Sequence, residues 1–323
     1  MSEPSRPSVI IDCDPGHDDA LAILLAARHL DVRAVTAVHG NAPLHRTHAN
    51  ARRVLELGGL THIPVAAGCA GPLVREARFA PEVHGESGLG GVDLPEPTMP
   101  LADAHATDVI IELSRSVPDL GVLAIGPLTN VATALRRDPT LASRVTRFSI
   151  MGGSLTWGNA TPAAEFNIWA DPEAAHVVFT SGVPITMVGL NVTMQSIATP
   201  DRRDALRATG RRVATAAADM LDPYAVGEGG YSGLPGGALH DPMAVATLID
   251  PSIVSTVPLH VAVETRGGIT DGMTLCDGRG LGPDLRPRGT GRHDATPPNA
   301  DVAVAVDEPR FWSLLFEALA AYD

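Results

Sequence analysis

Short apolar runs that alternate with helical patterns constrain the fold of this chain most. The runs are rich in Val, Ile and Leu and are apolar throughout, as expected of strands that are buried on both faces. Helical patterns of about 10 to 15 residues separate them, which is typical of βαβ units with right-handed crossovers. We therefore predict an α/β fold with a mostly parallel, Rossmann-like sheet flanked by helices.

The predicted elements are distributed over most of the chain. Strands are expected at 9–11, 32–38, 63–67, 121–125, 147–151, 185–190 and 302–306. Helices are expected at 20–30, 47–57, 107–116, 129–137, 172–180, 243–249 and 308–320. The glycine-rich stretches 227–237 and 278–298 are expected to be loops. Because no Ser/Gly/Pro-rich linker divides the chain, we predict one domain over 1–323, with a flexible N-terminus at 1–7.

The balance of charges excludes some classes of partner. The chain has 24 Lys plus Arg and 37 Asp plus Glu, a formal net charge of −13, and it contains no lysine. Nucleic acids and anionic membranes bind clustered cations, so we expect neither as a partner. The polar N-terminus does not resemble a signal peptide, and no run of about 18 apolar residues is present. We therefore predict a cytoplasmic protein.

An acidic cluster follows the first predicted strand. Its members are Asp12, Asp14, Asp18 and Asp19. Helix capping explains Asp18 or Asp19 but leaves Asp12 and Asp14 unexplained. A set of oxygen ligands without Cys or His suits a hard cation such as Ca²⁺ or Mg²⁺.

Two known types of metal site can be compared with this cluster. An EF-hand loop starting at Asp12 needs glycine at its sixth position and glutamate at its twelfth, where this chain has His17 and Ile23. We reject that motif. Mg²⁺-dependent phosphotransferases of the D-x-D type begin similarly, but they also need a downstream lysine. They remain an alternative that the absence of lysine disfavours.

Polar residues also follow other predicted strands, at 40–41, 126–130 and 152–153. In an open parallel sheet, ligands bind outside the carboxyl ends of the strands, so these residues are expected to share one crevice. His240-Asp241-Pro242 precedes an apolar helix, where Asp241 can be a simple cap. The polar segment 159–167 would suit a ligand rich in hydroxyl groups, although a hydrated loop explains it too.

Seven ordered blocks of the sequence resemble the nucleoside hydrolases of the inosine–uridine-preferring family. The blocks are 12–20, 84–88, 126–130, 151–153, 159–161, 164–167 and 240–242. The resemblance implies an enzyme of EC 3.2.2 type that hydrolyses the N-glycosidic bond of ribonucleosides, giving ribose and free base in nucleoside salvage or catabolism. It also implies a single α/β domain that binds one Ca²⁺ and forms a homo-oligomer, either a dimer or a tetramer.

The resemblance further implies a role for individual residues. Ca²⁺ would bind the side chains of Asp14, Asp19 and Asp241 and the main-chain carbonyl of Thr129. Asp14 would also be the general base toward calcium-bound water, and His240 would donate a proton to the leaving base. The substrate would contact Asp18, Asn41 and Asn167 at the 2′- and 3′-hydroxyls, Asn159 and Glu165 at the 5′-hydroxyl, Met151 at the ribose, and His84 near the base. Asp12 would support the site from behind.

The base side of the site has weaker sequence signals. Trp157, Tyr224 and Tyr231 are candidates to contact the base, although exposed loop positions explain the tyrosines equally well. Residues 222–239 are expected to form a glycine-hinged lid, and His17 is expected to be a surface or packing residue. The choice between purine and pyrimidine stays open. A nucleoside- or sugar-binding protein without turnover is a further alternative, against which Asp14 and His240 argue.

Overall fold

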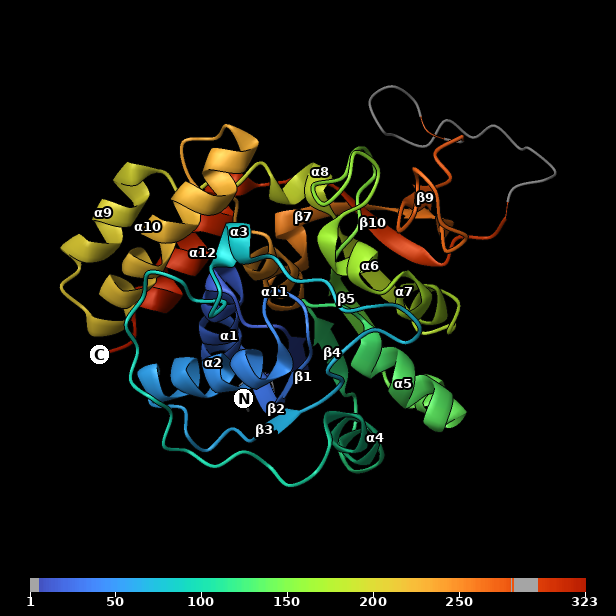
Figure 1. Cartoon of the computed structure of the whole chain (residues 1–323), viewed down its shortest axis with the longest axis horizontal. Coiled ribbons are helices and arrows are strands. Elements are labelled where there is room, and N and C mark those ends of the chain that lie inside the picture. Colours follow the sequence, from blue (N-terminus) through green and yellow to red (C-terminus); the bar gives the residue numbers. More distant parts are fainter. Residues whose placement is uncertain (1–5, 280, 282–295) are drawn as a thin grey trace, which may run out of the picture.

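An eight-stranded sheet crosses the centre of the molecule in the computed structural model, which describes residues 6–279, 281 and 296–323 (Figure 1). Its strand order is β3-β2-β1-β4-β5-β6-β10-β7, and only the β10–β7 pair is antiparallel. The strands are β1 (Ser8–Cys13), β2 (Asp31–Ala37), β3 (Val65–Ala67), β4 (Gly121–Ala124), β5 (Arg147–Met151), β6 (Ile185–Val188), β7 (Val254–Leu259) and β10 (Ala300–Val306). A separate two-stranded sheet contains β8 (Val261–Val263) and β9 (Thr274–Cys276).

Helices cover both faces of the sheet, and their apolar residues form two cores. One core contains residues of α1 (His17–His29), α2 (Leu44–Leu57), α9 (Pro200–Ala208), α10 (Arg212–Ser232), α11 (Asp241–Ile249) and α12 (Glu308–Ala320). The other contains residues of α4 (Ala106–Ser116), α5 (Thr129–Arg137) and α7 (Pro172–Phe179). Val9 and Ile11 of β1 belong to the first core and Ile10 to the second, so this strand is buried on both faces. The short elements are α3 (Pro81–His84), α6 (Phe166–Ala170), α8 (Leu190–Thr193), η1 (Pro139–Ser143) and η2 (Pro251–Ile253).

This topology brings together the loops that follow β1, β2, β4 and β5. The four strands are parallel neighbours, so their carboxyl ends meet at one edge of the sheet. The predicted α/β fold with a mostly parallel sheet is confirmed, and β5, α5 and α12 have the predicted bounds. Among the described residues, no helix is both long and apolar enough to cross a membrane.

Helix α1 begins at His17, three residues before its predicted start at 20. Its N-cap is Gly16, whose N–H donates to Asp19 Oδ2 at 2.9 Å. The helix therefore extends back into the acidic cluster and includes Asp18 and Asp19 in its first turn. At that position the free N–H groups and the helix dipole favour anionic side chains.

The prediction of a loop at 227–237 is wrong in its first half, because α10 continues to Ser232. The close approach of α3 explains the glycine at position 227 of this helix, because an added Cβ would lie 2.4 Å from the carbonyl oxygen of Val83 in α3. The glycine permits close helix packing, and so much of the expected 222–239 lid is helical. Residues 1–5 of the expected flexible N-terminus, and most of the expected 278–298 loop, lie outside the described residues.

Candidate active site

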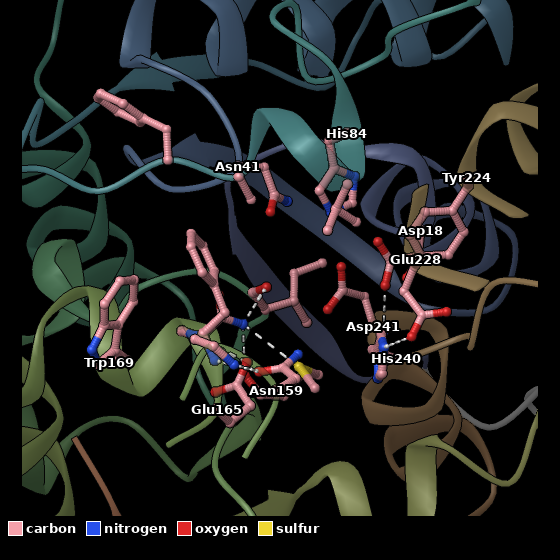
Figure 2. A pocket seen from close by; sticks show the side chains of 18 of the residues that line it. Asp18, Asn41, His84, Asn159, Glu165, Trp169, Tyr224, Glu228, His240 and Asp241 are labelled. Atoms are coloured by element: carbon pink, nitrogen blue, oxygen red, sulfur yellow. Dashed lines mark hydrogen bonds and ion pairs between the residues drawn. The ribbon is translucent and has the colours of Figure 1, made fainter. Parts of the chain in front are cut away.

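A cavity of about 210 Å³ opens at the carboxyl edge of the sheet (Figure 2). Its walls come from the first turn of α1, from the segments that follow β2, β4 and β5, and from α3, α6, α10 and α11. The sequence-predicted residues that line it are Asp18, Asn41, His84, Met151, Asn159, Glu165, Asn167, Tyr224, His240 and Asp241. Residues separated by more than two hundred positions thus share one crevice, as the parallel topology predicts.

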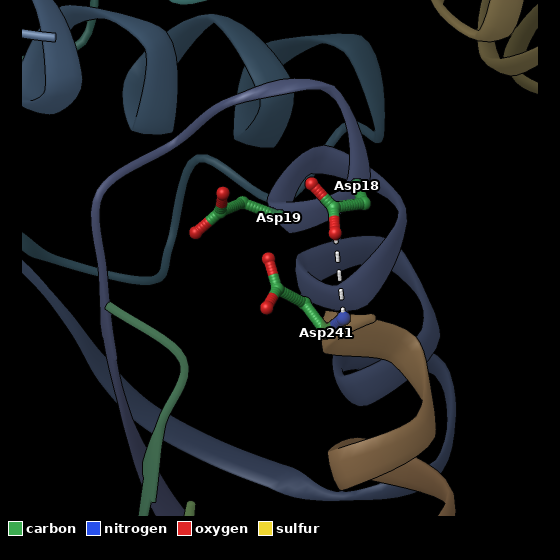
Figure 3. Close-up of side chains that lie close together, drawn as sticks. All are labelled: Asp18, Asp19 and Asp241. Atoms are coloured by element: carbon green, nitrogen blue, oxygen red, sulfur yellow. Dashed lines mark hydrogen bonds between the residues drawn. The ribbon is translucent and has the colours of Figure 1, made fainter. Parts of the chain in front are cut away.

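Three carboxylates gather beside this cavity (Figure 3). Asp18 and Asp19 come from the first turn of α1, Asp241 is the first residue of α11, and each offers an oxygen within 4.8 Å of the others. The Asp241 N–H donates to Asp18 Oδ2 at 3.5 Å. All three are buried, and burial together with the negative charge of Asp19 raises the pKa of Asp18 to about 8. Such a group of like charges can hold a divalent cation, which would offset the repulsion.

Asp14 follows the end of β1 and is fully buried. Its Oδ2 accepts the N–H of Asn41 at 2.6 Å, whereas its Oδ1 has no hydrogen-bond partner among the described residues. The carboxylate fits between two glycines: an added Cβ would lie 2.0 Å from Oδ2 at Gly40 and 2.5 Å from Oδ1 at Gly126. A buried oxygen without a partner is costly, so this cradle fits a cation ligand.

Asp19 and Asn41 connect Asp14 to the cavity. Asp19 accepts the Asp14 N–H through Oδ1 at 3.2 Å and the Asn41 amide through Oδ2 at 3.1 Å. Asp14 and Asp19 do not line the cavity itself; Asn41 does. Asp12 belongs to a different environment, because its Oδ1 accepts from Thr36 Oγ1 at 2.6 Å and from Asn130 Nδ2 at 2.8 Å. Burial raises the pKa of Asp12 to about 7.

Thr129 does not fit the predicted role of a carbonyl ligand, and this prediction is corrected. It is the first residue of α5, so its carbonyl points along the helix and accepts an intrahelical hydrogen bond. Its hydroxyl donates to Asp171 Oδ2 at 2.7 Å, outside the cavity lining. The residue of this loop that lines the cavity is Ile125, whose carbonyl accepts from Asn167 Nδ2 at 3.1 Å.

One end of the cavity carries amide and carboxyl groups near β5 and α6. Asn167 Nδ2 also donates to the Met151 carbonyl at 3.1 Å. Glu165 is the N-cap of α6: its Oε1 accepts the Asn167 N–H at 2.9 Å, and its Oε2 accepts the Gly153 N–H at 2.8 Å. Burial raises the pKa of Glu165 to about 7. Asn159 Oδ1 accepts the N–H of Phe166 at 3.0 Å, so these polar groups are held by their own backbone.

The opposite end carries aromatic and imidazole groups (Figure 2). His84 stacks on Tyr224 with ring centroids 5.4 Å apart, and His17 stacks on both rings. His240 Nδ1 lies 2.7 Å from Thr193 Oγ1, and burial lowers the pKa of His240 to about 4. Burial likewise lowers the pKa of His84 well below its usual value. Both imidazoles are therefore neutral near pH 7.

The three base-side candidates from the sequence have different positions. Tyr224 lines the cavity from α10, and its hydroxyl donates to the Ala238 carbonyl at 2.9 Å. Trp157 is 57% exposed and does not line the cavity, so its assignment is corrected. Tyr231 belongs to α10, but its side chain lies outside the described residues. His17 is a buried residue, and its Nδ1 lies 3.2 Å from His84 Nδ1.

Sequence reasoning missed several lining residues, chiefly Ile125, Trp169 and Glu228. The carbonyl of Ile125 gives no sequence signal, because any residue supplies one. Glu228 stands between glycines in a stretch that was predicted to be a loop, so the sequence did not place it on a helix. Its spacing of four from Tyr224 would have placed both on one face of a helix, had the helix been recognised.

Comparisons with known proteins agree with this geometry. The family model for inosine-uridine preferring nucleoside hydrolases matches residues 9–313. A pyrimidine-specific ribonucleoside hydrolase, RihA of Citrobacter koseri, is 44% identical over an alignment of 321 residues, and the match covers 97% of this chain and 98% of that protein.

Two solved structures are similar over nearly the whole fold. A plant nucleoside hydrolase, PpNRh1, has a TM-score of 0.89 at 36% identity, with 98% of this chain and 100% of that chain covered. A purine-preferring ribonucleoside hydrolase from Gardnerella vaginalis has a TM-score of 0.87 at 31% identity, with 97% and 98% covered. The chain belongs to the inosine-uridine preferring nucleoside hydrolase family.

Proposed function

We propose that this enzyme is a Ca²⁺-dependent ribonucleoside hydrolase that uses water to release ribose and a free base. The observation that carries this proposal is the buried carboxylate group beside the cavity, in which Asp18, Asp19 and Asp241 converge and Asp14 Oδ1 lacks a partner. Family membership disfavours the D-x-D phosphotransferase and the binding protein without turnover. The single domain over 1–323, the homo-oligomer and the cytoplasmic location stay predictions from the sequence.

The donor set supports a hard cation. We assign side-chain ligands to Asp14, Asp19 and Asp241, and a main-chain carbonyl to Ile125 in place of Thr129. All of these donors are oxygen atoms, which suits Ca²⁺. When bound, the ion would lower the pKa of a water molecule and orient it for attack.

The chain's own carboxylates and amides perform the remaining steps on the sugar. Besides holding the ion, Asp14 accepts the proton of the attacking water, because its Oδ1 has no hydrogen-bond partner among the described residues. Cleavage builds positive charge on the ribose, which the surrounding carboxylates stabilise. Hydrogen bonds to the sugar hydroxyls hold it in position and contribute several kcal/mol, about 7 at best. The residues that supply these bonds are Asp18, Asn41, Asn167, Asn159 and Glu165, with Met151 packed against the ring.

His240 serves the leaving base at the opposite end. When Thr193 donates its hydroxyl proton to Nδ1, the neutral imidazole carries its own proton on Nε2. Nε2 then donates a hydrogen bond that stabilises the negative charge of the base as the glycosidic bond breaks, and His84 and Tyr224 form the adjacent wall. We assign pyrimidine ribonucleosides as the preferred substrates, because the 44% identical relative from Citrobacter koseri is pyrimidine-specific.

A product assay tests this function. The enzyme with Ca²⁺ is incubated with uridine, cytidine, inosine and 2′-deoxyuridine, and ribose and free base are quantified by chromatography. We expect equimolar ribose and uracil or cytosine, slower release from inosine, and little release from 2′-deoxyuridine, which lacks one of the recognised hydroxyls. The absence of base release from every ribonucleoside would refute the proposal.

A further inference from the structure

Glu228 lies at the imidazole end of the cavity, in a role that the mechanism above does not use. Its carboxylate comes from α10 and its side chain is only 12% exposed. Oε2 accepts the N–H of Ala238 at 3.0 Å, which holds the group from behind. Oε1 faces Nε2 of His240 across 4.0 Å, a separation too long for a hydrogen bond (Figure 2).

Among the described residues, the one ion-pair partner of Glu228 is His240, whose Nε2 lies 4.0 Å from Oε1, so the carboxylate has no close counter-charge. A leaving base departs with the electron pair of the broken bond, so a bare carboxylate oxygen beside it would repel it. The repulsion becomes an attraction where the base presents an N–H to that oxygen, since carboxylates only accept hydrogen bonds.

We propose that Glu228 determines base specificity by accepting a hydrogen bond from an N–H group of the leaving nucleobase, while His240 Nε2 donates to the lone pair beside it. This inference rests on the proposed function and deepens it. Uracil carries N3–H beside its carbonyl oxygens, and cytosine carries its 4-amino group beside the N3 lone pair. Both bases therefore place a donor next to an acceptor, as required to bridge the Glu228–His240 gap.

A purely structural role for Glu228 makes a different prediction. Its bond to the Ala238 N–H joins α10 to the segment that precedes His240, and this alone would order the cavity wall. Glu228→Gln separates the two roles. The glutamine has the same length, and its carbonyl oxygen can still accept the N–H of Ala238. Its NH2 group, however, replaces the charged oxygen that would accept a hydrogen bond from the base.

The test compares kcat/KM of the wild type and Glu228→Gln on uridine, on cytidine and on 4-nitrophenyl β-D-ribofuranoside. The nitrophenolate leaving group has no N–H. We expect a fall of about tenfold to a hundredfold for both nucleosides, the effect of one lost hydrogen bond to a charged group. The nitrophenyl riboside should change less than about twofold. Glu86→Gln removes a similar charge from an exposed position outside the cavity lining and should behave as the wild type on all three substrates.

Two results with the variant would overturn the assignment. Equal losses on all three substrates would show a structural role, and unchanged nucleoside turnover would show no role. If wild-type protein cleaves no nucleoside, the proposed function itself fails, which the first measurement reveals before any variant is made. Should Glu228→Gln not fold, wild-type turnover of cytidine is compared with that of its analogue lacking the 4-amino group. We expect the analogue to be at least about tenfold slower, and equal rates would contradict the proposal.

Discussion

The unpartnered Oδ1 of Asp14 is the residue-scale feature on which the proposed chemistry depends most. Asp14→Asn keeps the shape of the side chain but removes the base and a cation ligand. We predict a fall in kcat of at least about a hundredfold, within the range for a lost general base. The variant should retain the wild-type circular dichroism spectrum, because the carboxylate is destabilising in the metal-free fold. Steady-state ribose release measures this, and near-normal kcat would exclude Asp14 as the base.

His240 is expected to act on the leaving group and not on the sugar. For His240→Ala we predict a fall in kcat of about a hundredfold or more for uridine. The effect on 4-nitrophenyl β-D-ribofuranoside should be much smaller, because nitrophenolate leaves without a proton. Parallel losses on both substrates would assign His240 to the fold of the site. Thr193→Val provides a related control, since it removes only the hydroxyl group next to Nδ1.

Residue-level prediction from the sequence was strongest for charged and amide side chains. Asp18, Asn41, Glu165 and Asp241 all line the cavity. They could be selected from the sequence because each stands in a motif with a distinct side-chain chemistry. Main-chain ligands have no such signature, and the Thr129 assignment was wrong for this reason. Trp157 was selected only for its nearness in sequence to Asn159, and it is exposed.

At the scale of elements, the contact between α3 and α10 shapes the base end of the cavity. His84 belongs to α3, Tyr224 and Glu228 belong to α10, and Gly227 allows the two helices to approach. In Gly227→Ala the new Cβ would meet the Val83 carbonyl oxygen at 2.4 Å. We predict a loss of about 1–3 kcal/mol in unfolding free energy from overpacking, together with a raised KM for uridine.

Gly230→Ala is the matched control in the same helix. Among the described residues, no atom outside the helix's own backbone and the two chain neighbours lies within 4 Å of a Cβ added there, so helix propensity alone should act. Alanine is favoured over glycine in a helix by about 1 kcal/mol, and the control should therefore be slightly more stable than the wild type. Urea unfolding measures both variants. Equal effects of the two substitutions would contradict the role given to the α3–α10 contact.

Element-level prediction succeeded where one strong pattern governs an element. Thr129–Arg137 and Glu308–Ala320 were predicted with their observed bounds, because each has a marked boundary and an apolar face. The glycines of α10 misled the prediction, since intrinsic propensity favours a loop there and tertiary packing favours a helix. The local sequence around Gly227 and Glu228 does not indicate that α3 packs against this part of α10.

At the scale of the whole molecule, buried carboxylates make the metal-free fold sensitive to pH. Burial raises the pKa of Asp12 to about 7 and that of Asp18 to about 8, from a usual value of 3.8. The folded state holds these carboxyl protons up to a higher pH than the unfolded state does. The stabilising contribution is therefore complete below pH 3.8 and is lost as the pH rises through the raised pKa values. We predict that the melting temperature in chelator falls between about pH 5 and pH 8.

Added Ca²⁺ should reverse this trend, because a bound cation stabilises ionised carboxylates and binds only the folded state. The rise in melting temperature on adding Ca²⁺ should therefore be larger at pH 8 than at pH 5. Differential scanning fluorimetry with chelator and with Ca²⁺ measures both effects. A melting temperature in chelator that rises steadily from about pH 5 to pH 8 would contradict the proposal that ionised buried carboxylates destabilise the metal-free fold.

The overall α/β architecture was the most predictable level of the molecule. Continuous apolar strands separated by helices specify a parallel sheet, and its carboxyl edge is then the expected site. The antiparallel β7 was not predicted because Pro258 disfavours a strand, and β8 and β9 were not predicted because three residues each are too few to show a period. The net charge of −13 did not indicate which carboxylates lie close together, and only the fold shows that Asp18, Asp19 and Asp241 do.

The dependence of nucleoside hydrolysis on a cation held by the carboxylate group can be measured in a single titration. The initial rate of uracil release from uridine is measured in a chelator-buffered series of free Ca²⁺ concentrations. We predict no detectable rate in excess chelator and full recovery along a single saturation curve, with one Ca²⁺ bound per chain at the plateau. An undiminished rate in excess chelator would show that hydrolysis does not require a cation at this carboxylate group.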